Sequence, residues 1–416
     1  MTERTLLAWS RFRVIRDFIL SVIGQQMNPD QLHGAVFEVD MTSQERHELR
    51  YQRRKAKRDQ KKYRRENQDY DLIFSYEHLY SAYLKCRRNV AWKASTQNYI
   101  AQAPLNVYHT FDILKREKFK TLGFHEFDLY ERGKHRHIRS VHMKERVVQR
   151  CLCDQCLTPM LTRAFVYDNG ASMENKGYTF AIRRMIRHLQ YHYRKHGTEG
   201  YILLFDFSKF FESISHDVVK KILEDRLCDD RVKRLTFHLI DAFGDGGLGL
   251  GSQISQLLAL ISCNSLDHYV KEKLRIRGYG RYMDDGYLIH ESKQYLQECL
   301  KEIKAICEEL HVNLNLKKTQ IVKISRGFTY LKTRFFLLPT GQVVRKIYKR
   351  SVTKMRQKLK KLRKLLTAGK VTITDVMASW NSWRSYALTF SAWHTVQNMQ
   401  ELFYQLFESE VMAHVL

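Results

Sequence analysis

The residues best suited to chemistry are three acids at the ends of β-prone segments. Asp284 and Asp285 lie in Gly278–Glu291 (GYGRYMDDGYLIHE), where two short β-prone runs flank a tight turn. Asp206 ends the apolar run Tyr201–Phe205, which has the length and continuity of a strand buried on both faces. Adjacent carboxylates repel each other unless a cation neutralises them. If the two segments are neighbouring strands, Asp206 and Asp284 can jointly bind two Mg²⁺ ions, an arrangement suited to nucleotidyl transfer.

A solvated acidic turn is the alternative explanation of the hairpin alone, and the second acid at a strand end argues against it. The motif YMDD (Tyr282–Asp285), preceded by a strand that ends in FDFSKFF (Phe205–Phe211), resembles the palm of a reverse transcriptase. The resemblance covers roughly residues 110–400. It implies RNA-templated DNA synthesis from dNTPs with two Mg²⁺ ions, for which Mn²⁺ is a possible substitute.

The same resemblance implies the fold class and its division into domains. We expect an α+β right-hand polymerase of fingers, palm and thumb, with a mostly helical N-terminal extension and a helical thumb. The expected bounds are 1–110 for the basic extension, 111–200 for the fingers, 201–335 for the palm and 336–416 for the thumb. No nuclease or maturase-like appendix is visible after the thumb.

The resemblance also assigns roles within these motifs. Phe207 offers its backbone carbonyl as a further metal ligand, and Phe211 excludes a 2′-hydroxyl and so selects deoxynucleotides. Lys318, in the segment Asn313–Thr319, protonates the departing pyrophosphate, with Lys317 as the alternative. The predicted catalytic residues are Asp206, Asp284, Asp285 and Lys318, and the predicted metal ligands are Asp206, Phe207, Asp284 and Asp285.

Two further segments are expected to contact the incoming dNTP. Phe124–Val141 alternates like a β-hairpin, and the resemblance to the fingers places Lys134 and Arg136 on its phosphates. Val141 stands where the family usually has proline, which leaves Arg139 as a possible substitute contact; solvated cations on a surface hairpin are the alternative.

The second segment is glycine-rich, from Gly244 to Gly251, and leads into a helix whose N-terminus suits an anion or a base pair. It resembles the family motif that packs on the nascent base pair, and Gly251 and Gln256 are its predicted substrate contacts. The Ser255-Gln256 ending resembles phage-defence-associated and diversity-generating bacterial reverse transcriptases. A plain glycine-rich linker is the alternative.

The charge balance indicates a polyanionic partner, because the chain carries 71 Lys and Arg against 44 Asp and Glu. Arg46–Arg65 lacks apolar anchors, and we expect it to bind a structured cognate RNA. Arg345–Lys370 has an apolar stripe that we expect to fix it to the palm, so that its cations hold duplex. The predicted nucleic-acid contacts are Arg53, Arg54, Lys57, Arg58, Lys61 and Lys62 in the first segment, and Lys358, Lys360, Lys361 and Lys364 in the second.

Cysteine spacing and hydropathy limit the remaining possibilities. The eight cysteines show no paired framework; Cys151, Cys153 and Cys156 suggest zinc, but no second ligand pair follows. No apolar run approaches the length of a membrane span, and charged residues interrupt the N-terminal apolar stretch. We therefore expect a cytoplasmic protein without a membrane partner.

Three function classes remain. The first is a reverse transcriptase with a dedicated non-coding RNA, in phage defence rather than in diversity generation. The second is an RNA-dependent RNA polymerase or an untemplated nucleotidyltransferase, and Phe211 argues against ribonucleotides as its substrates. The third is a non-catalytic RNA-binding protein, against which the three retained acids argue.

Overall fold

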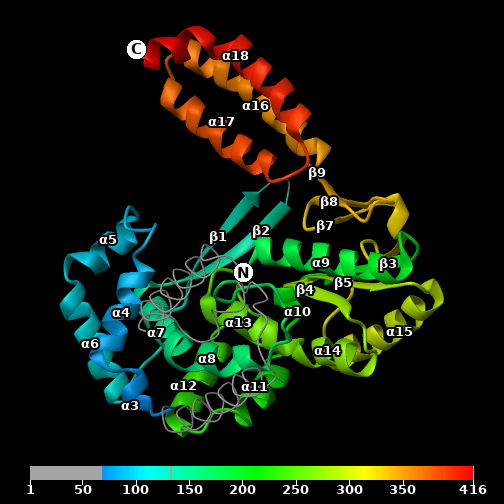
Figure 1. Cartoon of the computed structure of the whole chain (residues 1–416). Coiled ribbons are helices and arrows are strands. Elements are labelled where there is room, and N and C mark those ends of the chain that lie inside the picture. The colour runs from blue at the N-terminus through cyan, green and yellow to red at the C-terminus, as the bar shows by residue number, and fades with distance from the viewer. Residues whose placement is uncertain (1–67, 132–133, 416) are drawn as a thin grey trace, which may run out of the picture. The chain divides into compact units, whose positions relative to one another are not determined.

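The computed structural model describes residues 68–131 and 134–415 of the 416-residue chain (Figure 1). The predicted RNA-binding cations of the N-terminal basic segment lie outside the described residues: Arg53, Arg54, Lys57, Arg58, Lys61 and Lys62.

In the described part of the chain, four helices precede the first hairpin, and the last three of them pack against α7 (Met143–Leu152). The side chain of Asp69 caps the first of them by accepting a hydrogen bond from the Leu72 amide at 3.0 Å. The Tyr70 hydroxyl donates to the Leu114 carbonyl at 3.0 Å, which ties the first helix to the last. The four helices are α3 (Tyr70–Ile73), α4 (Tyr76–Cys86), α5 (Ala94–Ala101) and α6 (Ala103–Lys115).

The expected fingers hairpin is present as β1 (Phe124–Glu131) and β2 (Lys134–Val141), which pair antiparallel. The chain then continues through α7, a π-helical turn (Cys153–Leu157), α8 (Thr158–Leu161) and a 3₁₀ turn (Thr162–Ala164) into α9 (Tyr178–His196). Cys151, Cys153 and Cys156 are buried in this helical stretch, and the Cys151 thiol donates to the Ile73 carbonyl at 3.1 Å. Among the described residues these cysteines form no metal-binding group.

The segment expected to form the palm contains a four-stranded antiparallel sheet in the order β4-β5-β3-β6. Its strands are β3 (Tyr201–Asp206), β4 (Gly278–Tyr282), β5 (Asp285–His290) and β6 (Gln320–Lys323). Between β3 and β4 lie α10 (Phe210–Ser213), α11 (His216–Glu224), α12 (Asp230–Asp241), α13 (Gln253–Ser262), α14 (Asn264–His268) and a π-helical turn (Tyr269–Lys273). Between β5 and β6 lies α15 (Lys293–Glu309), and a 3₁₀ turn (Ile324–Arg326) follows β6.

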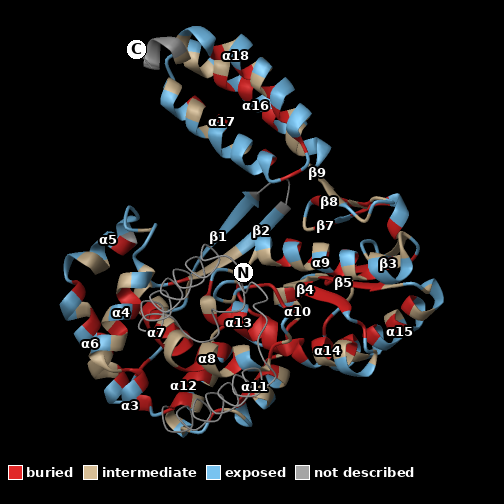
Figure 2. Cartoon of the chain, viewed as in Figure 1, coloured by how far each residue is buried: buried red, intermediate tan, exposed pale blue. Residues whose placement is uncertain are grey.

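The strand β3 is buried on both faces, as its unbroken apolar run predicts. Leu203 and Phe205 belong to the large core that includes α13, whereas Ile202 and Leu204 belong to a second core that includes α9. Figure 2 shows the buried residues concentrated on α13 and on the strands β4 and β5. The sheet is therefore held from both sides.

After β6 and its 3₁₀ turn come a small sheet and three helices. The sheet contains β7 (Phe328–Tyr330), β8 (Thr333–Leu337) and β9 (Val343–Lys346), and the helices are α16 (Lys349–Thr367), α17 (Ile373–Leu388) and α18 (Trp393–Val415). No described helix has the length and apolar character that crossing a bilayer requires.

The apolar stripe of α16 does not fix that helix to the palm, so this prediction was wrong. Met355, Leu359 and Leu362 are buried in a separate core with Trp380 of α17 and Phe403 of α18. The physical reason is that the two following helices supply the apolar partners the stripe needs. The predicted duplex-binding lysines, Lys358, Lys360, Lys361 and Lys364, are exposed, as expected.

Candidate active site

Three carboxylates converge where β3 ends and β5 begins. Asp206 and Asp285 are partners in the β3–β5 register, and Asp284 lies in the turn between β4 and β5. One oxygen from each of the three acids lies within 4.8 Å of the others. The sequence placed both adjacent aspartates in the turn; the structure puts Met283 and Asp284 there and makes Asp285 the first residue of β5.

The turn is held in an unusual backbone conformation. Met283 has φ +54°, a left-handed value that favours glycine. The Phe207 amide donates to the Asp284 carbonyl at 3.2 Å, so the segment after β3 fixes the turn from the neighbouring strand. Gly286 must lack a side chain, because a Cβ there would lie 2.1 Å from the Phe205 ring. These contacts set the position of both adjacent acids.

The three acids fit a hard divalent cation. Asp206 is 4% exposed, and Asp284 is half-buried beside it. Burial, together with the charge of the neighbouring Asp206, raises the pKa of Asp284. A cation between the carboxylates would remove this repulsion, and carboxylate oxygens are the ligands that Mg²⁺ and Mn²⁺ prefer.

Lys318 lies beside the three acids. Its ammonium group forms an ion pair with Asp206. Burial alone would lower the pKa of Lys318, but the hydrogen bond and charge of Asp206, with the charges of Asp285 and Asp284, raise it overall. The backbone N–H of Asn315 donates to the backbone carbonyl of Asp206 at 2.7 Å, which fixes the segment that carries Lys318 beside the end of β3. Both predicted lysines are exposed, and the ion pair with Asp206 is formed by Lys318, so the geometry favours Lys318.

The aromatic residues after β3 divide into a packed pair and a half-buried ring. Phe207 and Phe210 are buried and stacked, with ring centroids 5.2 Å apart. Phe211 is half-buried and meets Phe210 edge-on at 5.7 Å, and its carbonyl accepts from the Leu248 amide at 2.6 Å. Phe211 is therefore the ring still able to face a substrate, and its backbone joins the β3 segment to the glycine-rich loop.

The fingers hairpin meets this loop through Arg139. Its guanidinium forms an ion pair with Glu126 at 2.9 Å, lies 4.4 Å from the Phe124 ring centre, and donates to the Phe243 carbonyl at 2.7 Å. A Cβ on Gly251 would lie 3.7 Å from the Arg139 carbonyl, so the two predicted substrate residues are close neighbours. Arg139 thus already has protein partners, and its phosphate contact stays a prediction.

The other predicted substrate residues occupy nearby elements. Lys134 begins β2 and Arg136 is exposed on the same strand. Gln256 is exposed on α13, where its side-chain oxygen accepts a hydrogen bond from the Ser172 hydroxyl at 3.1 Å. The dNTP-binding roles of these three residues stay predictions.

A buried polar chain supports the glycine-rich loop, and the sequence analysis missed it. Ser252 donates to Gln149 at 2.5 Å, and Gln149 donates to Glu145 at 3.0 Å. Glu145 in turn accepts from the Leu122 amide at 3.2 Å, and burial raises the pKa of this carboxyl. The spacing of Glu145 and Gln149, four residues apart on an amphipathic helix, was the available signal.

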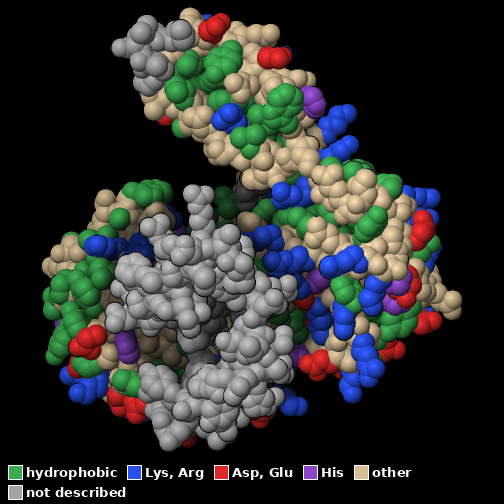
Figure 3. Space-filling model, viewed as in Figure 1, with side chains coloured by type: hydrophobic (Ala, Val, Ile, Leu, Met, Phe, Trp, Pro, Cys, Tyr) green, Lys and Arg blue, Asp and Glu red, His purple; other side chains and the backbone are tan. Residues whose placement is uncertain are grey.

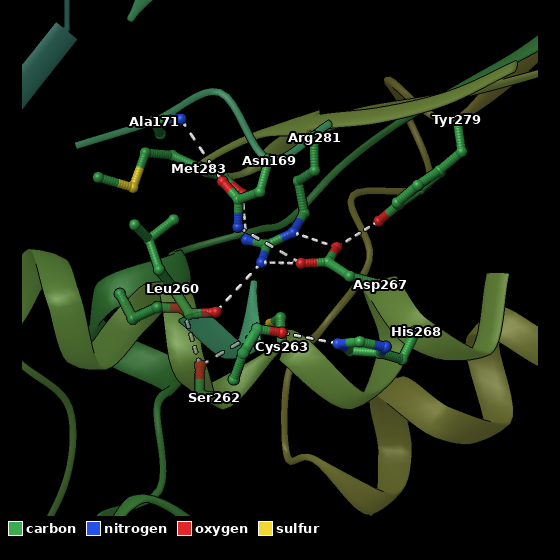
Figure 4. A network of polar contacts seen from close by, with 12 residues as sticks. Asn169, Ala171, Leu260, Ser262, Cys263, Asp267, His268, Tyr279, Arg281 and Met283 are labelled. Atoms are coloured by element: carbon green, nitrogen blue, oxygen red, sulfur yellow. Dashed lines mark hydrogen bonds and ion pairs between the residues drawn. The ribbon is translucent and has the colours of Figure 1, made fainter. Parts of the chain in front are cut away.

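A second buried network supports the turn that contains Met283 and Asp284 (Figure 4). Arg281 and Asp267 are both fully buried and form a two-pronged ion pair, with N–O distances of 2.7 and 2.6 Å. The Tyr279 hydroxyl also donates to Asp267, at 2.5 Å. The remaining Arg281 nitrogen donates to the Met283 carbonyl at 3.0 Å, so this network reaches the residue whose backbone is left-handed. Sequence analysis missed it because nothing in the local pattern pairs Arg281 with Asp267.

Comparison with known proteins identifies the family. The model of the family "Reverse transcriptase (RNA-dependent DNA polymerase)" matches residues 115–335, which is more than half of the chain. The chain belongs to the reverse transcriptase family. By family it is an RNA-directed DNA polymerase, a nucleotidyltransferase, and its mixed fold is the expected right-hand polymerase. No curated protein matches the chain by sequence.

Among solved structures, this reverse transcriptase is similar to two yeast telomerases. Apo telomerase from Candida tropicalis, truncated from its C-terminal domain, is 13% identical with a TM-score of 0.43, and the match covers 58% of this chain and 60% of that one. Telomerase from Candida albicans, in complex with a TWJ fragment of telomeric RNA, is 12% identical with a TM-score of 0.46, and the match covers 76% of this chain and 61% of that one. The match thus spans about three-fifths of each telomerase chain.

Proposed function

We propose that this reverse transcriptase copies an RNA template into DNA at Asp206, Asp284 and Asp285, using dNTPs and two Mg²⁺ ions. The observation that supports this most directly is the strand register that makes Asp206 the partner of Asp285, with the three acids within 4.8 Å. Mn²⁺ is an alternative ion for the same oxygen ligands.

In this proposal the three carboxylates and the Phe207 carbonyl hold the cations, which when bound lower the cost of charge on the attacking and leaving oxygens. Lys318, beside Asp206, donates a proton to the departing pyrophosphate. Phe211 presses on the sugar and excludes a 2′-hydroxyl. Lys134, Arg136 and Arg139 hold the phosphates, and Gly251 and Gln256 contact the nascent pair.

Primer extension tests this proposal. Wild-type protein with Mg²⁺, a primed RNA template and labelled dNTPs should extend the primer, and Asp206→Ala should abolish extension while it retains RNA binding. Asp225→Ala, an exposed acid at the end of α11, is the matched control and should extend normally. Equal extension by Asp206→Ala and wild type would refute the assignment of the site.

We further propose that the enzyme works with a dedicated structured non-coding RNA in a cytoplasmic anti-phage defence system. The support is the Ser255-Gln256 ending of the glycine-rich segment and the charge of Arg46–Arg65, eleven of whose twenty residues are Lys or Arg. Sequencing the nucleic acid that copurifies with wild type and with Asp284→Ala/Asp285→Ala tests this setting. One recurrent RNA with a DNA copy only in wild type would support it; DNA unrelated to any copurified RNA would favour untemplated synthesis.

The two basic segments should act differently. Neutralising four of the six N-terminal cations should weaken cognate-RNA binding and flatten its salt dependence, because each phosphate contact releases counterions. It should spare extension of a generic primer–template. Neutralising Lys358, Lys360, Lys361 and Lys364 of α16 should impair extension on every template. Equal loss of generic extension by both sets would refute this division.

A further inference from the structure

A cationic pocket lies between α9 and the segment that enters β4. Its volume is 560 Å³, and five Lys or Arg side chains but only one acid line it. The residues that matter here are Asp168, Arg184, Arg187, Arg194, Lys271 and Arg277. None of them belongs to the predicted catalytic or substrate-binding set.

The single acid is already neutralised. Asp168 has a side chain only 6% exposed, and it forms ion pairs with Arg184 and with Lys271, the latter at 2.6 Å. The charges of His188 and Lys271 and the hydrogen bond from Arg184 outweigh its burial and lower the pKa of Asp168. The acid therefore holds two cations in the floor of the pocket and leaves the other three unbalanced.

Those three cations are exposed and form no ion pair with an acid in the described part of the chain: Arg187, Arg194 and Arg277. Arg277 is oriented by Tyr191, whose hydroxyl accepts a hydrogen bond from its guanidinium at 2.7 Å. The pKa of the Tyr191 hydroxyl is lowered by its hydrogen bond with Lys195, and further by the hydrogen bond from Arg277 and the positive charges of both residues. The pocket thus has a strongly positive, partly fixed wall.

The arrangement suits a chain of phosphates better than a single anion. Arg187 and Arg194 are seven residues apart on one face of α9, a separation of about 10 Å along the helix. Arg277 lines the same pocket from the segment between the π-helical turn Tyr269–Lys273 and β4. In Figure 3 blue side chains gather along α9, so the positive surface extends along the helix.

The pocket is remote from the point of synthesis. Arg277 immediately precedes β4, and six residues along the chain separate it from Met283 at the catalytic turn. At about 3.3 Å per residue of strand, this is about 20 Å. A nucleic acid held at the pocket is therefore not the base pair being formed.

We propose that this α9 groove binds the phosphate backbone of single-stranded RNA flanking the copied segment. This rests on the proposed function for the identity of the RNA, but its binding is measured without catalysis. Arg187, Arg194 and Arg277 each contact a phosphate, whereas Arg184 and Lys271 stay on Asp168. A free nucleoside triphosphate is the competing ligand of the same chemistry.

The test compares two probes, a short RNA/DNA hybrid and the same hybrid with long oligouridine tails on its RNA strand, on full-length protein without dNTPs. Each lost single-strand contact lowers the slope of log affinity against log salt by about 0.7, hence about 2 for three contacts. At about 0.15 M salt this corresponds to about 50-fold weaker binding. Arg187→Gln/Arg194→Gln/Arg277→Gln should show this loss with the tailed probe only.

The matched control removes three exposed cations from α15, by Lys293→Gln/Lys301→Gln/Lys304→Gln, and should bind the tailed probe much more tightly than the groove variant does. Replacing the three groove arginines by lysine keeps the charge and should retain most of the affinity. Both arginine variants should extend the short hybrid normally wherever wild type does.

Three outcomes overturn the proposal: unchanged affinity and salt slope for the tailed probe, an equal loss in the α15 control, or an equal loss with the short hybrid. Loss of UTP binding with an unchanged RNA salt slope would instead identify a nucleotide pocket and also overturn it. Failure of wild type to extend any primer would count against the polymerase proposal alone, since the binding comparison does not need catalysis.

Discussion

Replacing Arg281 by methionine should be among the most destabilising single changes in the palm. The ion pair of Arg281 with Asp267 and that of Arg234 with Glu117 have nearly equal N–O distances, 2.6 and 2.7 Å. They differ in exposure: both side chains are 0% exposed in the first pair, against 63% and 44% in the second. Removing one partner of a buried pair strands the other charge and costs about 3–5 kcal/mol, whereas an exposed pair contributes about 0–1 kcal/mol.

The assay is equilibrium urea unfolding of full-length Arg281→Met, with Arg234→Met as the matched control. We expect the free energy of unfolding to fall by about 3–5 kcal/mol in the first and by less than about 1 kcal/mol in the second. Because asparagine removes the stranded charge while its side-chain oxygen still accepts from Tyr279, Arg281→Met/Asp267→Asn should regain at least half of the loss. Equal losses in the two single variants would refute the reasoning.

The double variant also separates stability from activity. It still lacks the hydrogen bond from Arg281 to the Met283 carbonyl, so the catalytic turn loses a restraint even when the core is repaired. A hydrogen bond from a charged donor is worth about 1.5–3 kcal/mol, and the rate of extension should therefore stay reduced by about tenfold or more. Recovery of the full extension rate together with stability would mean that the pair only supports the core.

The remaining predictions concern the sugar gate, the general acid and a buried histidine. Phe211→Val should raise the use of rNTP relative to dNTP by about tenfold or more in primer extension; an unchanged preference would make Phe211 a packing residue. Lys318→Gln should slow single-turnover extension by about 100-fold, whereas Lys317→Gln should not, and the reverse order would contradict the assignment. Burial lowers the pKa of His188 to about 4 from about 6.5, so it contributes stability above pH 6.5 that is lost as the pH falls towards 4. This amounts to about 3 kcal/mol; urea unfolding of His188→Gln should lack that pH dependence, and a slope equal to that of wild type would refute it.

The sequence predicted the fold where periodicity was local. The run Tyr201–Phe205, ended by an acid, gave a two-faced buried strand, and the runs around Asp284 gave a hairpin that pairs with it. The apolar stripe of α16 correctly predicted a helix with its lysines facing outward. It did not predict that α17 and α18 cover the stripe, because an apolar stripe shows that a helix face is buried but not which surface buries it. The same limit applies wherever helices choose among several apolar neighbours.

The site was predictable to the extent that its motifs are contiguous. The three acids come from two short segments, and the structure brings them together as expected. The sequence could not tell whether Lys317 or Lys318 faces the acids, because the backbone conformation decides which of two adjacent side chains points towards them. The pair Arg281 and Asp267 was missed because buried charges have no periodic signal; they are recognised by their partners, which only the tertiary structure supplies.

The two-sided burial of β3 makes its length decisive for bringing the three acids together. Deleting one residue from it would exchange the side chains of the two cores, since successive residues point to opposite faces. Deleting two would keep the faces but draw Asp206 back by about 7 Å, more than the 4.8 Å that spans the three acids. Insertions or deletions between α9 and β3 should therefore be tolerated only in the loop 197–200. A chain in which β3 pairs with β5 in the wrong register would still be compact, but it could not bring its three carboxylates together.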